Sequence, residues 1–228
     1  MRHIGSMVPK TAFAFGVGFI ALSAAIGPFG TATASAQTII DDWQKVKPPA
    51  APVLKPVTVD AKTTALLILD FNGAQDPTKG PCNKNTKPRC LASVPKVETL
   101  LDEARAKDVF VVYSLAGAGE PQDIATDLAP LASDPIVKSG PDKFIGTNLR
   151  SILADKGIKT VIVTGTASEG AVLDTATDAA LNGMNIILPV DGMSSTELYG
   201  EQYVAWHMAN APGVSQKTTL TRTDMIKF

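Results

Sequence analysis

The stretch TVIVTGTASEGAVLDTATDA, residues 160–179, constrains the fold of this chain more than any other. Its first five residues, 160–164, are β-branched and predict a buried strand of a parallel sheet. The small-residue run over 170–180 predicts the helix that follows. Gly165 lies between the two and lets the chain turn sharply at the end of the strand. The pattern therefore predicts a strand, a tight turn and a helix, which is the repeating unit of open α/β folds.

The turn between this strand and this helix is also a candidate ligand site. Ser168 is a suitable helix N-cap, and Glu169 in the first turn suits the helix dipole. We expect free backbone N–H groups near Gly170 and Ala171 to point out of the carboxyl edge of the sheet. Open α/β folds bind their ligands at that edge.

The rest of the chain repeats the alternation of strand and helix. This order predicts a single doubly wound, Rossmann-like domain with three layers, in which a mostly parallel sheet carries helices on both faces. We expect strands at 65–69, 109–115, 160–164, 186–190 and 218–221, and helices at 94–107, 148–156, 170–180 and 195–211. A short helix is expected at 124–131, within a long irregular connection typical of a functional loop.

Residues 1–36 have the pattern of a signal peptide. Arg2 and Lys10 supply positive charge, residues 11–26 are apolar, and Ala34-Ser35-Ala36 is a typical cleavage site. A retained membrane anchor is the alternative, but the apolar run is shorter than the roughly 20 residues that a span needs. We expect cleavage after Ala36, export to a periplasm or to the medium, and no stable membrane anchor in the mature protein.

The next segment, residues 37–62, reads as a proline-rich arm before a domain at 63–228. Four prolines, at positions 48, 49, 52 and 56, exclude a helix and favour an extended chain. The arm is either a loose tether or a strand that docks along the domain with Trp43 as an anchor. We expect docking.

Cys82 and Cys90 are the two cysteines of the chain. An even cysteine number in an exported protein predicts a disulfide. A thiol pair for catalysis or metal binding is the alternative. The spacing is not that of a zinc site, however, and no histidine lies nearby in the sequence.

Charge and histidine content exclude some functions. The net charge is −1, and loss of Arg2 and Lys10 with the signal segment makes the rest slightly more acidic, so no basic face for nucleic acid is expected. His207 is the one histidine after residue 36, on the last expected helix. A serine or cysteine triad is therefore improbable, and His207 reads as a surface or partly buried helix residue.

Three charged residues stand out beside the predicted strands. Asp70 directly follows the apolar run 65–69, so it is either a cap or a member of a site at the carboxyl edge of the sheet. Lys138 and Lys143 lie in the segment KSGPDKFIGTNL. Composition alone reads both lysines as solvated surface charges.

Three segments together resemble the isochorismatase-like, or cysteine hydrolase, superfamily over residues 63–195. The first is Asp70-Phe71-Asn72 after an apolar strand. The second is Lys138, with Phe144 six residues later and Gly-Thr behind it. The third is VTGTASEGAVLDTATDA, in which members usually carry a nucleophilic cysteine six residues after the glycine of the turn. Here that position is Ala171.

The resemblance implies roles for particular residues. Asp70 would act as acid and base, and Lys138 as its electrostatic partner, with Lys143 as the alternative should the loop register differ. Ala171 would stand at the nucleophile position without being a nucleophile. The resemblance further implies that the substrate pocket is lined by Asn72, Phe144, Thr166, Ala167 and Gly170.

The missing cysteine leaves three hypotheses. The first is a hydrolase that uses Asp70 as a general acid, as isochorismatases proper protonate a vinyl ether without a cysteine. The second replaces the thiol by the hydroxyl of Ser168 or Thr166. The third is an inactive domain that binds a small ligand. We predict the first, with a small-molecule substrate, no cofactor, no metal because the first long loop has no histidine, and a homo-oligomeric state.

Overall fold

The computed structural model describes residues 37–74, 76 and 80–228. The expected signal segment, residues 1–36, lies outside the described residues. Residues 37–47 belong to a separate compact unit, in which the described part has one 3₁₀ turn, η1 (Trp43–Lys45), and an exposed Trp43. All other elements belong to the unit that begins at Pro48.

This unit is built on a seven-stranded sheet with the order β4-β3-β2-β5-β6-β8, and β7 pairs with the end of β5. Every pairing in the sheet is parallel, as the alternation of elements predicts. The strands are β2 (Thr64–Leu69), β3 (Phe110–Leu115), β4 (Ile136–Lys138), β5 (Thr160–Thr166), β6 (Asn185–Pro189), β7 (Met193–Ser194) and β8 (Thr218–Thr221). A separate parallel pair joins β1 (Val57–Thr58) to β9 (Ile226–Lys227).

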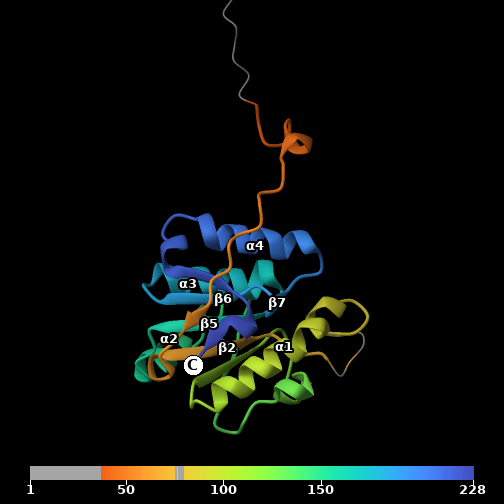
Figure 1. Ribbon diagram of the computed structural model, residues 1–228. Coiled ribbons are helices and arrows are strands. Elements are labelled where there is room, and N and C mark those ends of the chain that lie inside the picture. Colours follow the sequence, from red (N-terminus) through yellow and green to blue (C-terminus); the bar gives the residue numbers. More distant parts are fainter. Residues whose placement is uncertain (1–36, 75, 77–79) are drawn as a thin grey trace, which may run out of the picture. The chain divides into compact units, whose positions relative to one another are not determined.

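Helices cover both faces of the sheet, which makes three layers (Figure 1). Because successive strand residues face opposite sides, Leu67 and Leu69 pack in one core with the helices α2 (Leu149–Asp155), α3 (Leu173–Leu181) and α4 (Leu198–Asn210). Leu66 and Ile68 pack in the other core against α1 (Pro88–Arg105). The predicted three-layer α/β fold is confirmed.

Element boundaries differ from the expectations in a few places. α1 begins six residues earlier than expected and contains Pro95, although proline usually ends a helix. The short helix expected at 124–131 is a single 3₁₀ turn, η4 (Thr126–Leu128). The short strands β4 and β7 were not predicted, because two or three residues carry too little periodicity to be recognised.

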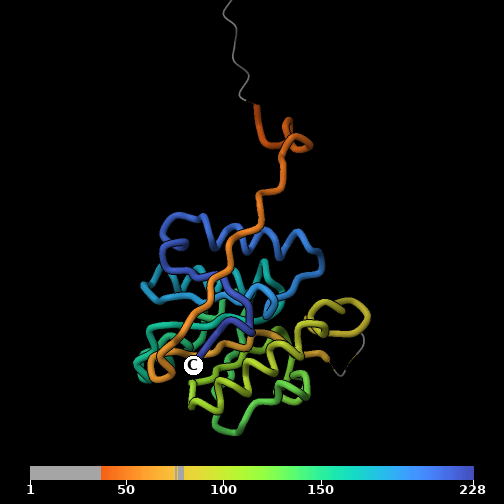
Figure 2. The backbone as a smooth tube through the Cα atoms, in the orientation of Figure 1, coloured from red at the N-terminus to blue at the C-terminus, as the bar shows by residue number. Residues whose placement is uncertain are grey.

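From Pro48 onward the proline-rich arm docks on the domain, but Trp43, the expected anchor, is exposed and belongs to the other unit. The Lys55 N–H donates to the Leu220 carbonyl of β8, and Leu54 packs against the core beneath α4. Figure 2 shows this segment crossing α4 on its way towards the sheet. Among the described residues, no helix is long and apolar enough to cross a bilayer.

Cys82 and Cys90 form a disulfide with 5.2 Å between their Cα atoms, as predicted. Both side chains are buried, and Cys90 lies in the first turn of α1. The bond ties the start of that helix to the loop that follows β2. A loop of this length contributes roughly 2 to 3 kcal/mol on the chain-entropy estimate.

Candidate active site

The candidate site lies where β2 and β5 end side by side. Leu69 and Gly165 are paired across the two strands, so Asp70 and Thr166 follow at the same edge of the sheet. Gly165 has a φ of 148°, and a Cβ on it would lie 2.5 Å from the Leu69 carbonyl oxygen. Gly165 is therefore required by this close approach inside β5, and not by a turn after the strand as expected.

Asp70 is a buried carboxyl group with two hydrogen-bond partners. The Ser114 hydroxyl donates to Oδ1 at 2.6 Å, and the Lys143 ammonium donates to Oδ2 at 2.7 Å. Burial raises the pKa of Asp70 above its usual 3.8, and the Lys143 charge and the two hydrogen bonds oppose that rise. A carboxyl group with a raised pKa is suited to carry and deliver a proton.

Lys143 is fully buried, which is rare for a lysine without a paired charge. Besides Asp70, its ammonium donates to the Gly140 carbonyl at 2.8 Å. Its backbone N–H donates to the Thr175 hydroxyl of α3, and its carbonyl accepts from the Thr147 hydroxyl. These bonds hold the loop so that the lysine side chain points into the protein.

Lys138 does not reach the candidate site. It is the last residue of β4, its side chain is half exposed, and its ammonium pairs with Glu120 at 2.8 Å. The geometry thus corrects the preferred assignment: the lysine beside Asp70 is Lys143, the alternative. The family resemblance favoured Lys138 through its spacing to Phe144, whereas in the structure the bend over residues 140–142 precedes Lys143, whose side chain reaches Asp70.

Ala171 lies close to the loop that carries Lys143. It is buried in a π-helical turn, η5 (Ser168–Val172), that leads into α3. A Cβ on Gly170 would lie 3.8 Å from Pro141, so the lysine loop passes directly over this turn. Thr175, which holds the Lys143 backbone, lies one helical turn after Ala171.

Ser168 has a different environment from the one expected. Ala167 is the N-cap of η5, and Ser168 lies inside the turn, fully buried, so the prediction of a Ser168 cap is wrong. Its hydroxyl has no hydrogen-bond partner among the described residues. The Gly170 N–H donates to the Ala167 carbonyl and is therefore not free, contrary to expectation.

The other predicted pocket residues are held by protein contacts. Both polar atoms of the Asn72 side chain bond to the backbone of Ala116. Phe144 belongs to the core. The guanidinium carbon of Arg150 lies over the Phe144 ring, 4.9 Å from the ring centre. The Thr166 hydroxyl donates to the Ser194 carbonyl of β7.

Ser114 is a member of this cluster that the sequence reasoning missed. It is buried at the end of β3, next to Asp70. The signal was present, because a polar residue near the end of an apolar strand run faces the same edge of the sheet as Asp70.

The next question is whether metal-ligating side chains or His207 belong to the cluster around Asp70. Within the described part of the chain, no group of three histidine, cysteine, aspartate or glutamate side chains could hold a metal ion. That no metal takes part remains a prediction. His207 is half buried on α4, with its ring 5.8 Å from that of Tyr203, in keeping with the expected helix position.

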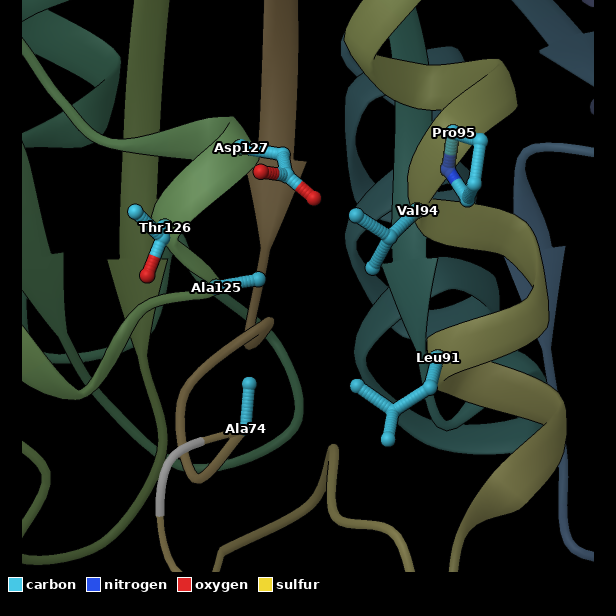
Figure 3. Close-up of a pocket in the computed structure, with 7 residues that line it drawn as sticks. All are labelled: Ala74, Leu91, Val94, Pro95, Ala125, Thr126 and Asp127. Atoms are coloured by element: carbon cyan, nitrogen blue, oxygen red, sulfur yellow. The ribbon is translucent and has the colours of Figure 1, made fainter.

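A separate cavity of about 320 Å³ opens on the α1 side of the same sheet edge. In Figure 3, Leu91, Val94 and Pro95 line it from α1, opposite Ala74 and the residues around η4. Its Ala125 donates to the carbonyl of Phe71, the neighbour of Asp70. Asp70, Lys143 and Ala171 do not line this cavity, so it is distinct from the buried cluster.

The parallel α/β fold agrees with the comparison to known proteins. The family profile described as the isochorismatase domain matches residues 64–220, which include Asp70, Ser114, Lys143 and Ala171. The chain belongs to the isochorismatase family.

Two curated relatives and one solved structure illustrate this membership. A secreted isochorismatase effector from Verticillium dahliae is 26% identical over 156 residues, which cover 64% of this chain and 80% of the relative. A nicotinamidase from Acinetobacter baylyi is 32% identical over 75 residues, 33% of this chain and 35% of the relative. The crystal structure of a cysteine hydrolase from Pseudomonas syringae has a TM-score of 0.63 at 18% identity, covering 76% of this chain and 95% of that one.

These comparisons establish the class of protein. The isochorismatase family and the structural neighbours of this chain are hydrolases that include nicotinamidase and N-carbamoylsarcosine amidase. The chain is therefore assigned to the isochorismatase-family hydrolases, a family of enzymes that act on small-molecule substrates.

Proposed function

We propose that this protein is an exported isochorismatase-family hydrolase that acts on a small organic molecule by acid–base catalysis through Asp70 and Lys143, without a cysteine nucleophile. The observation that carries the proposal is the buried ion pair, whose Nζ and Oδ2 atoms are 2.7 Å apart. Ala171, at the position where the family resemblance expects the nucleophile, cannot form a covalent intermediate. In this proposal the chemistry depends on proton transfer and on water.

Hydrolysis of an enol ether needs only the Asp70 carboxyl group, its partner Lys143 and water. The protonated Asp70 carboxyl would give its proton to the terminal vinyl carbon, which leaves a cation stabilised by the ether oxygen. Water adds to that cation and returns a proton to the Asp70 carboxylate, and the hemiketal collapses to a carbonyl compound and an alcohol. Lys143 would lower the free-energy cost of the buried Asp70 carboxylate, because its ammonium supplies the opposite charge.

One observation favours a second candidate. The Ser168 hydroxyl is fully buried and has no partner among the described residues, and buried polar groups normally have one. A hydroxyl left free in this way could contact the substrate or replace the missing thiol. Loss of turnover in Ser168→Ala, with Asp70→Asn still active, would favour this candidate over the acid mechanism.

Export is the second part of the proposal. It is supported by the secretion-type pattern of residues 1–36, by the Cys82–Cys90 disulfide, and by the similarity to a secreted effector. Disulfides persist in oxidising compartments, so the periplasm or the medium suits this domain.

The decisive experiment finds a ligand first and then tests turnover. A panel of small carboxylates, amides and enol ethers is screened by thermal stabilisation, which reports binding with or without chemistry, and each hit is followed by mass spectrometry. We expect a hit that is consumed by the wild type and by Lys138→Met, and about 100-fold or more slowly by Asp70→Asn and Lys143→Met. Lys138→Met is the matched control because it removes a lysine from the same segment outside the ion pair.

The pH profile gives an independent readout of the same proposal. A general acid works in its protonated form, so turnover should fall as the pH rises through the pKa of Asp70, which lies above 3.8. A hit that binds and is recovered intact from the wild type at every pH would contradict the enzyme proposal and indicate a small-ligand-binding protein.

A further inference from the structure

We propose that Ser114 is a positioning residue for Asp70, which stays hydrogen-bonded to the carboxyl group in both of its protonation states. The inference rests on the proposed acid role of Asp70. Ser114 is nearly fully buried, and its Oγ lies 2.6 Å from Asp70 Oδ1. The Ser114 hydroxyl donates to Asp70 and not to Lys143, so its contribution acts through Asp70.

The two partners of Asp70 differ in what they can do. An ammonium group only donates hydrogen bonds, so Lys143 can bond an unprotonated oxygen of the carboxyl group but cannot accept the acid proton. A hydroxyl group donates or accepts by rotating about its C–O bond, so Ser114 can donate to the carboxylate and accept from the protonated acid. Because its partner is a hydroxyl, Oδ1 of Asp70 can keep its hydrogen bond to Ser114 in both the charged and the protonated form.

The backbone adds a second constraint at the same place. The Asp70 N–H donates to the Ser114 carbonyl at 3.2 Å, in continuation of the pairing between β2 and β3. Asp70 itself has a φ of 60°, a left-handed conformation that few residues other than glycine adopt. Ser114 thus holds Asp70 by main chain and side chain, and both oxygens of the carboxyl group are fixed in direction by Ser114 and Lys143.

The groups that act on Asp70 are few. Lys143 from the loop after β4 and Ser114 from β3 are the groups that lower its pKa, against the effect of burial. On the β5 side, the neighbours Thr164 and Gly165 are uncharged. The Thr164 hydroxyl donates its hydrogen bond to the Leu67 carbonyl. Among the described residues, loss of the Ser114 hydroxyl leaves Lys143 as the group that opposes burial, so we expect the pKa of Asp70 to rise.

The test is a titration of the Asp70 carboxyl carbon by NMR, with the signal assigned through Asp70→Asn. We expect Ser114→Ala to raise the pKa of Asp70 by about one pH unit or more, the effect of one hydrogen bond to a charged group. Ser114→Thr should restore the wild-type value, and Ser114→Cys, a weaker donor, should fall between them. Ser93→Ala is the control, because it removes a buried hydroxyl that donates to the Cys90 carbonyl of α1 and not to Asp70.

Turnover separates this inference from the proposed function. With a substrate in hand, the fall in activity at high pH should move upward in Ser114→Ala by the same amount as the titration, a change that a purely structural role would not produce. An unchanged pKa of Asp70 in Ser114→Ala and Ser114→Cys would overturn the inference and leave the acid role intact. A raised pKa with no movement of the pH profile would support the contact between Ser114 and Asp70 and contradict the acid role.

Discussion

Asp70 and Lys143 form an ion pair from which water is almost wholly removed. The lysine side chain is fully buried and the aspartate side chain is 5% exposed. Taking both charges out of water costs several kcal/mol, and their attraction repays that cost only with good geometry and further hydrogen bonds. Ser114 and the Gly140 carbonyl supply those bonds here. Such an arrangement costs folding free energy and is therefore more naturally explained by chemistry than by stability.

The pair makes a prediction for stability. Asp70→Asn or Lys143→Met should each destabilise the fold by about 3–5 kcal/mol, because each leaves a buried charged or polar partner unmatched. The double variant should lose clearly less than the sum of the two single losses. Urea unfolding of the four proteins measures this coupling, with the exposed Lys138→Met expected within about 0.5 kcal/mol of the wild type. Additive losses would contradict the pairing.

The same pair determines a pH dependence of stability. Because the pKa of Asp70 is raised in the folded protein, the folded state binds the proton more tightly than the unfolded chain does. The contribution of Asp70 to stability is therefore greatest below pH 3.8 and is lost as the pH rises through the folded-state pKa. The Asp70→Asn variant should lack this slope, which urea midpoints at a series of pH values would show.

At the scale of elements, the close contact between β2 and β5 brings the site together. Gly165 lets the two strands approach, and the residues after the contact, Asp70 on one strand and Thr166 on the other, face the same edge. The π-helical turn η5 and the loop at Gly140 then approach each other over that edge.

Gly165→Ala should destabilise the fold strongly, since the new methyl group would meet the Leu69 backbone and its φ of 148° suits only glycine. Gly183→Ala is the matched control. Its φ of 92° is also unfavourable for alanine, but a Cβ there meets no atom within 4 Å. We expect the control to lose about 1–2 kcal/mol and Gly165→Ala to lose more. Equal midpoints in urea would contradict the argument from close approach.

At the scale of the whole molecule, the arm and the disulfide add contacts around the domain, and the disulfide is consistent with export. The arm adds backbone bonding at β8, and Cys82–Cys90 closes the loop before α1. Both features stabilise the domain without affecting the Asp70 site directly.

Export makes a prediction about the covalent form of the protein. When the full chain is expressed in a bacterium, the protein recovered from the periplasm or medium should begin at Gln37 and contain no free thiol. Intact mass spectrometry before and after alkylation measures both properties. Replacing Ala34 and Ala36 by lysine should prevent cleavage, whereas Ala51→Lys should not. Recovery of the uncleaved chain from the cytoplasm would contradict the proposal.

The sequence by itself determined the fold class, the parallel direction of the main strands, the disulfide and the position of Asp70 directly after a core strand. These features depend on local patterns: β-branched runs, small-residue helices and a charged residue directly after an apolar strand. The family resemblance could be recognised for the same reason, since its motifs are short and contiguous.

Only the tertiary structure decided which lysine meets Asp70, that Ser114 completes the pair, and that the Ser168 hydroxyl has no partner among the described residues. The family resemblance placed Lys138 in the site, but in the structure Lys138 pairs with Glu120 and Lys143 reaches Asp70. The physical reason is that burial and hydrogen bonding between segments far apart in the chain are set by how the elements pack, and local sequence does not record that packing.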